Sequence, residues 1–122
     1  KAISEIISVT MKSFVENRSD TAYMVEPLEQ VIDLICRKAK ADHIARLQRG
    51  ECTIGNGYVF NDMLTDFERI SDHCSNIAAV IVESKHGSMN VHSSVSETKH
   101  EHLHRFDEYY SMYKEKYLTE QV

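Results

Sequence analysis

Proline and glycine, the residues that interrupt secondary structure, are scarce in this chain, which has one proline and four glycines among 122 residues. A β fold with many turns needs more of both, so their scarcity favours a few long elements. Apolar residues make up 42% of the chain and charged residues 27%, which is the balance of an ordinary globular protein. A chain of this length supports one modest core, and we expect a single domain over residues 1–122.

Cysteine is also scarce. Cys36, Cys52 and Cys74 are odd in number and lack the spacing of a zinc site or a disulfide framework. Reduced thiols in a cytoplasmic compartment fit this pattern best. No apolar run reaches the ~20 residues of a membrane span, and no signal peptide is visible. The chain begins at Lys1 rather than at a methionine, which suggests a piece of a longer protein.

A surplus of positive charge is lacking too, because the formal net charge is -5 with histidine neutral. Binding to the phosphates of a nucleic acid needs a basic stripe, so we expect no nucleic-acid partner. The motifs GxSxG, GxGxxG and the P-loop do not occur, and support for nucleophilic catalysis is slight. We therefore expect a protein that is not an enzyme and has no catalytic residues.

Apolar residues recur three and four positions apart in four segments, as on one face of a helix. Ser19 or Asp20 can cap the second helix, and Pro27 in its first turns allows a kink or a later start. The polar residues 85–96 predict a loop. Four helices with short connections predict an all-α, up-and-down antiparallel helical bundle. The predicted helices span about residues 2–17, 21–49, 56–84 and 97–119.

Two pairs of acidic residues lie beside the apolar lines of the second and third helices. One pair is Glu29 and Asp33, and the other is Glu68 and Asp72, with Asn76 four positions further on. Residues at this spacing share a helix face, and two such pairs on neighbouring helices can converge on one site. Their oxygens suit Mg, Ca, Mn or Fe. Each pair taken alone is more often a solvated acidic face.

The acidic pairs lie in segments that resemble the PhoU family. Residues 67–73 (FERISDH) with residues 76–78 (NIA) are similar to the ERIxD(H)xxNIA signature, and residues 29–33 are similar to the second ExxxD motif. The resemblance is closest to the PhoU-like cytoplasmic domain at the C-terminus of bacterial sodium/phosphate cotransporter-type membrane proteins. The further segments that carry it are residues 43–47, 51–53, 62–78 and 109–117.

The resemblance implies a PhoU-like three-helix repeat over about residues 1–85, with a fourth helix at the C-terminus. It implies metal ligands at Glu29, Asp33, Glu68 and Asp72, with Asn76 in support, and iron or zinc as the metal. The implied role is regulation of phosphate uptake, on the cytoplasmic side of the membrane, within a larger sodium-dependent transporter. The implied partners are the membrane transporter domain of the same chain and, because the family has two repeats and this chain has one, a second copy in a homodimer.

A carboxylate-bridged metal-dependent enzyme in a helical bundle is the alternative. It needs an open coordination position and a histidine or other base near the carboxylates. His43 could face the bundle interior, whereas His73 points about 100° around the helix from Asp72. A third hypothesis is a scaffold bundle whose acidic stripes keep it in solution.

Overall fold

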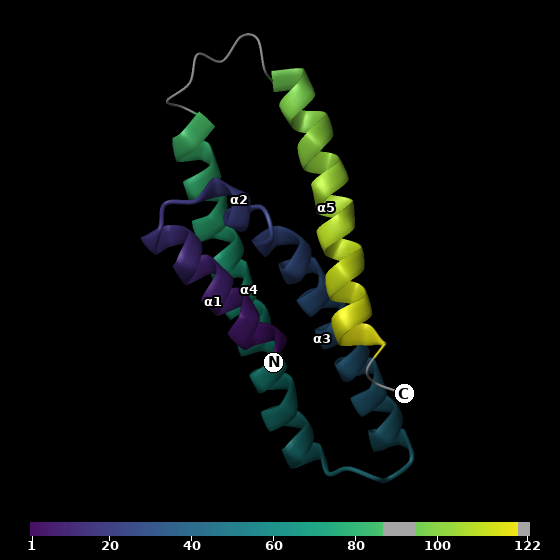
Figure 1. Ribbon diagram of the computed structural model, residues 1–122. Coiled ribbons are helices and arrows are strands. Elements are labelled where there is room, and N and C mark those ends of the chain that lie inside the picture. The colour runs from purple at the N-terminus through teal and green to yellow at the C-terminus, as the bar shows by residue number, and fades with distance from the viewer. Residues whose placement is uncertain (87–94, 120–122) are drawn as a thin grey trace.

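The computed structural model describes residues 1–86 and 95–119 of the chain, and these residues form helices and short connections without any strand (Figure 1). The prediction of an all-α helical bundle is therefore confirmed. Four helices are long and one is a single short turn. Their bounds are α1 (Ala2–Val15), α2 (Ser19–Ala22), α3 (Val25–Gln48), α4 (Ile54–His86) and α5 (Val95–Leu118).

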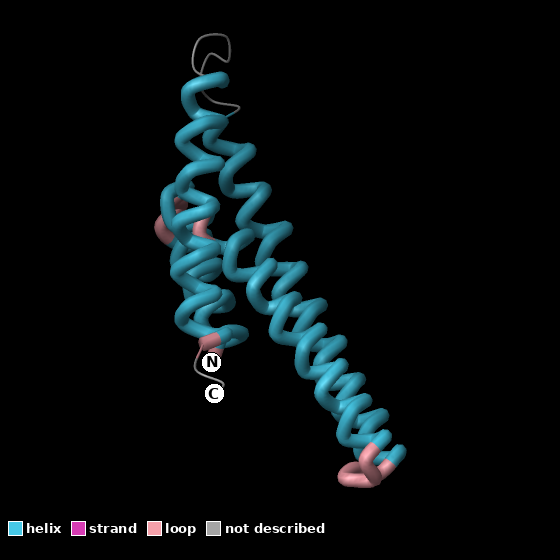
Figure 2. Tube along the Cα trace, turned by 90° about the vertical axis from the view of Figure 1, so that its right-hand side faces the viewer, coloured by secondary structure: helices cyan, strands magenta, loops and turns pink. Residues whose placement is uncertain are grey.

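The long helices alternate in direction, with α1 and α4 running one way and α3 and α5 the other (Figure 1). Helix α3 is central, since it packs against α1, α4 and α5, while α1 also packs against α4. The lower part of α3 and the start of α4 form a hairpin that extends beyond the other helices (Figure 2). Among the described residues, no helix combines the length and hydropathy of a membrane span.

One core joins the long helices, because each contributes residues at helical spacing to a shared interior. Cys36 and Cys74 belong to it and are buried free thiols, which is how unpaired cysteine commonly behaves. The buried apolar residues are Ile6, Ala22, Val25, Leu28, Val31, Ile32, Cys36, Leu64, Cys74, Ala78, Ile81 and Tyr113.

The start of the second predicted helix differs from the expectation. Residues 19–22 form the separate turn α2, and α3 begins only at Val25. A helix running through from residue 21 would press the Pro27 ring against a carbonyl of the preceding turn. As the third residue of α3, Pro27 lacks an N–H that would have no partner within the helix anyway. The predicted cap does not form either, since the Asp20 carboxylate accepts a 3.0 Å hydrogen bond from Arg18 Nε instead.

Helix α4 exceeds its predicted span by two residues at each end, and α5 begins two residues earlier than expected. The predicted loop at residues 85–96 is therefore shorter than expected. Its residues 87–94 lie outside the part of the chain that the structure describes.

Candidate functional site

The two acidic pairs lie on the facing sides of α3 and α4. Glu29 and Asp33 come from α3, and Glu68 and Asp72 from α4. Close packing of the two helices brings the pairs together, as shown by the Cys36 thiol, which donates a 4.0 Å hydrogen bond to the Leu64 carbonyl. The structure thus places four carboxyl groups from two helices in one cluster, and their role as metal ligands stays a prediction.

The electrostatics of the cluster show how close these groups lie. Partial burial, followed by the charges of Asp33 and Asp72, raises the pKa of Glu29 to about 7. A protonated Glu29 is near enough to both residues for hydrogen bonds. Burial, then Asp72 and Glu68, also raises the pKa of Asp33, while Arg37 opposes the shift. Like charges held together disfavour the ionised form, so the cluster carries poorly compensated negative charge.

One cation already pairs with the cluster. The Lys40 ammonium lies 3.1 Å from each carboxylate oxygen of Glu68, and both side chains are about two-thirds buried. Lys40 was not among the residues predicted for this site. It follows Asp33 by seven residues, which is nearly two full helical turns, so this spacing could have placed it on the same face of α3.

The donor set fits a hard cation, because carboxylate oxygens are the ligands such ions prefer and because the negative charge on Glu29 is disfavoured. The arrangement is not a closed coordination site. Within residues 1–86 and 95–119, no group of three or more His, Cys, Asp or Glu side chains is placed so that it could hold a metal ion. Glu68 forms an ion pair with Lys40, whose ammonium group supplies positive charge where a metal ion would otherwise do so.

Three further polar residues singled out in the sequence, Asn76, His43 and His73, lie on α3 and α4. Asn76 is exposed and lines a hollow beside the end of α1, together with Phe14 and Asn17. His43 is buried, and its ring lies 5.1 Å from that of Phe60. His73 is exposed on α4. Asn76 lies one helical turn beyond Asp72 on α4, and its part in a metal site stays a prediction.

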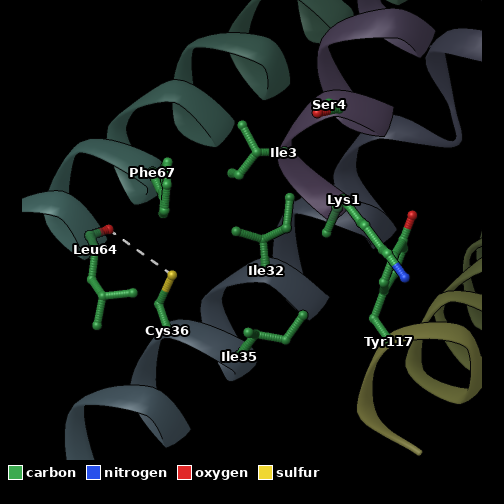
Figure 3. A pocket seen from close by; sticks show the side chains of 10 residues that line it. Lys1, Ile3, Ser4, Ile32, Ile35, Cys36, Leu64, Phe67 and Tyr117 are labelled. Atoms are coloured by element: carbon green, nitrogen blue, oxygen red, sulfur yellow. Dashed lines mark hydrogen bonds between the residues drawn. The ribbon is translucent and has the colours of Figure 1, made fainter. Parts of the chain in front are cut away.

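An apolar cavity of about 530 Å³ lies next to the acidic cluster, between the start of α1, the middle of α3 and α4, and the end of α5 (Figure 3). Cys36 sits in its wall, with Ile32 and Phe67 nearby. Burial, then the charge of Glu68, raises the pKa of the Cys36 thiol. The raised pKa disfavours the thiolate, which is the reactive form of a cysteine.

These features define a helical bundle with a carboxylate-rich seam between two helices. The PhoU domain model matches residues 1–81, which include α1, α2, α3 and most of α4. The chain belongs to the PhoU domain family. This family is generally regulatory and not enzymatic, and it indicates a role in the regulation of phosphate transport. Among curated proteins and among solved structures, none is significantly similar to the chain.

Proposed function

We propose that the chain is the regulatory domain of a sodium-dependent phosphate transporter and that its acidic cluster binds a divalent metal, iron or zinc. In this proposal, the transporter domain of the same protein holds the regulatory domain on the cytoplasmic side of the membrane. One observation carries the proposal: a member of the PhoU domain family holds acidic pairs from α3 and α4 in one cluster. Such a cluster is costly unless a cation binds there.

Each member of the cluster has a part in this proposal. Glu29, Asp33, Glu68 and Asp72 supply the oxygens. Since the pKa of Glu29 is about 7, this residue releases its proton when a cation binds near neutral pH. Glu68 exchanges its ion pair with Lys40 for the cation. A bound cation would supply positive charge between α3 and α4. The resulting change in the packing of this helix pair would be transmitted to the transporter domain through contacts between helices.

The metal arm is tested on protein purified without chelators, by metal analysis and by titration with Fe²⁺ and Zn²⁺. The Glu29→Gln/Asp33→Asn and Glu68→Gln/Asp72→Asn variants are expected to lose about tenfold or more in affinity, because each removes two anionic ligands. The matched control is Glu26→Gln/Asp62→Asn, which neutralises exposed acids on the same helices. Absence of binding by the wild type, or equal loss in the control, would refute the metal site.

The regulatory arm is tested separately by sodium-dependent phosphate uptake in cells that express the complete gene. Deletion of this domain and the four-acid variant are both expected to change how uptake responds to external phosphate. Unchanged uptake after deletion would contradict the regulatory role whatever the metal result. Turnover of a substrate by metal-loaded protein would instead support the carboxylate-bridged enzyme.

A further inference from the structure

Lys40 of α3 places a cation of the protein itself at the acidic cluster. Its ammonium donates hydrogen bonds of 3.1 Å to both carboxylate oxygens of Glu68. The side chains of this pair are 32% and 27% exposed, whereas those of the Lys38–Asp42 pair on the same helix are 54% and 52% exposed. Because water screens the Lys40–Glu68 pair less, this pair is stronger than an ordinary surface ion pair.

The register of α3 against α4 fixes where this pair lies. The two helices are antiparallel, and the Cys36 thiol of α3 contacts the Leu64 carbonyl of α4 (Figure 3). From Cys36, Asp33 lies about one turn toward the start of α3. From Leu64, Glu68 lies about one turn further along α4, in the same direction in space. The acidic cluster is therefore on this side of Cys36, and Lys40 lies one turn away on the other side.

The direction of the two side chains follows from this register, because side chains on a helix lean toward the start of that helix. Lys40 leans toward the acidic cluster. Glu68 leans away from Asp72, since α4 runs the opposite way, and pairing with Lys40 holds its carboxylate in that direction. A cation shared by all four acids needs this carboxylate to turn back, which breaks both hydrogen bonds to Lys40.

We propose that Lys40 competes with a divalent metal ion for Glu68 and thereby sets the metal concentration at which the acidic cluster fills. This inference rests on the proposed metal binding and adds the residue that regulates it. A tethered ammonium has a high effective concentration beside its partner, so an incoming ion must displace it. An ion of single charge only replaces the charge of Lys40. A divalent ion adds to the positive charge, so the competition favours divalent ions.

The competition gives the contact between α3 and α4 two alternative states. In the metal-free state Glu68 pairs with Lys40, as the structure shows. In the metal-bound state Glu68 faces the other acids and Lys40 is released. A ligand shifts an equilibrium between two states only by the difference in its affinity for them, and the turn of Glu68 supplies that difference.

The Lys40→Met variant tests the competition, because methionine removes the charge and keeps a long unbranched side chain. Calorimetric titration with Zn²⁺ is expected to show binding about five- to tenfold tighter than that of the wild type, since no ion pair has to break. Lys40→Arg keeps a cation that can pair with Glu68 and should bind like the wild type. Circular dichroism checks that the variants keep their helices.

Lys38→Met is the matched control, since it removes the same charge from an exposed ion pair of the same helix. It is expected to change the dissociation constant less than about twofold, because an exposed charge is screened. Release of Lys40 is measured in the wild type by acetylation of its lysines, located by mass spectrometry. Zn²⁺ is expected to increase the rate of acetylation at Lys40 and to leave the rate at Lys38 unchanged.

The outcomes separate this inference from the metal site itself. Zn²⁺ binding that is equally tight in the wild type and in Lys40→Met would overturn the competition and leave the proposed metal site standing. Equal tightening by Lys38→Met and Lys40→Met would also overturn it. Binding by Lys40→Met alone would support the competition and refute metal binding by the wild type. Binding by neither would refute both.

Discussion

At the scale of single residues, Glu29 shows how the acidic cluster acts on stability. Its pKa of about 7 exceeds its ordinary value of 4.5, so the folded state keeps a proton that the unfolded chain has already lost. The stability contributed by this proton is fully present below about pH 4.5 and is lost as the pH rises through about 7. Higher pH therefore weakens the metal-free fold through Glu29.

The Glu29→Gln variant should remove this pH dependence. In chelator-treated protein, the wild type is expected to lose about 1–2 kcal/mol of unfolding free energy relative to the variant between about pH 5 and pH 8, after allowance for solvent screening. Urea denaturation at a series of pH values measures the difference. Glu26→Gln, an exposed change on the same helix, should follow the wild type. If the unfolding free energies of the wild type and of Glu29→Gln changed in parallel with pH, the raised pKa of Glu29 would be contradicted.

A second residue-scale constraint lies in the hairpin of α3 and α4. A Cβ atom added at Gly57 would lie 2.6 Å from His43 Nε2, and the His43 ring is buried beside Phe60. Real Cβ atoms do not approach that closely, so a side chain at residue 57 would force the His43 ring to shift within its buried surroundings. The glycine is therefore needed for close packing of the hairpin.

Gly57→Ala is expected to destabilise the protein by about 1–3 kcal/mol through this overpacking. Gly55→Ala is the matched control, since nothing lies within 4 Å of its added Cβ in the same turn of α4. It should be neutral or stabilising by up to about 1 kcal/mol, because alanine favours the helix. Thermal unfolding followed by circular dichroism gives both values, and equal effects of the two substitutions would show that the His43 contact is unimportant.

At the scale of elements, the described side chains of α5 that attach it to the bundle include the buried Tyr113 and a polar cluster with α1. Tyr113 is fully buried. Nearer the end of the helix, Glu5 of α1 accepts hydrogen bonds from Lys116 Nζ, at 3.1 and 3.0 Å, and from the Tyr117 hydroxyl. Burial, then the charge of Glu5, raises the pKa of Tyr113. Packing of the Tyr113 ring, with these bonds, attaches α5 to the rest of the fold.

The Tyr113 hydroxyl has no hydrogen-bond partner within the described residues. Because a buried unsatisfied hydroxyl costs stability, Tyr113→Phe is expected to raise the unfolding free energy by about 1 kcal/mol. Tyr113→Ala removes the ring itself and should lower it by about 3–5 kcal/mol. Urea denaturation compares the two variants. A loss of stability in Tyr113→Phe would mean that the hydroxyl makes a favourable contact.

At the scale of the whole molecule, α5 belongs to the fold although the PhoU match ends at residue 81. A chain that stops after His86 keeps α1 to α4 and loses the packing of Tyr113. We expect it to remain helical and to lose about 3 kcal/mol or more of unfolding free energy. Denaturation followed by circular dichroism tests this, and an unchanged midpoint would show that α5 is an independent arm.

The sequence predicted the helices well because their signal is local. Apolar residues three and four positions apart must face one side of a helix, so the all-α bundle followed from spacing alone. The same geometry placed Glu29 with Asp33 and Glu68 with Asp72 on shared faces. It did not predict that Asp20, in the separate turn α2, pairs with Arg18 rather than capping a helix. A short-range competition between two hydrogen bonds leaves no periodic trace in the sequence.

Helical content and the paired acids were therefore determined by the order of residues, because 3.6 residues per turn fixes which side chains share a face. Only the tertiary structure decided which faces meet. It brought Lys40 to Glu68 and took Asn76 to a hollow beside Phe14. It also left the apolar side of α1 uncovered. Each of these outcomes depends on how separate helices pack, and the free energy of that packing is summed over contacts between distant parts of the chain.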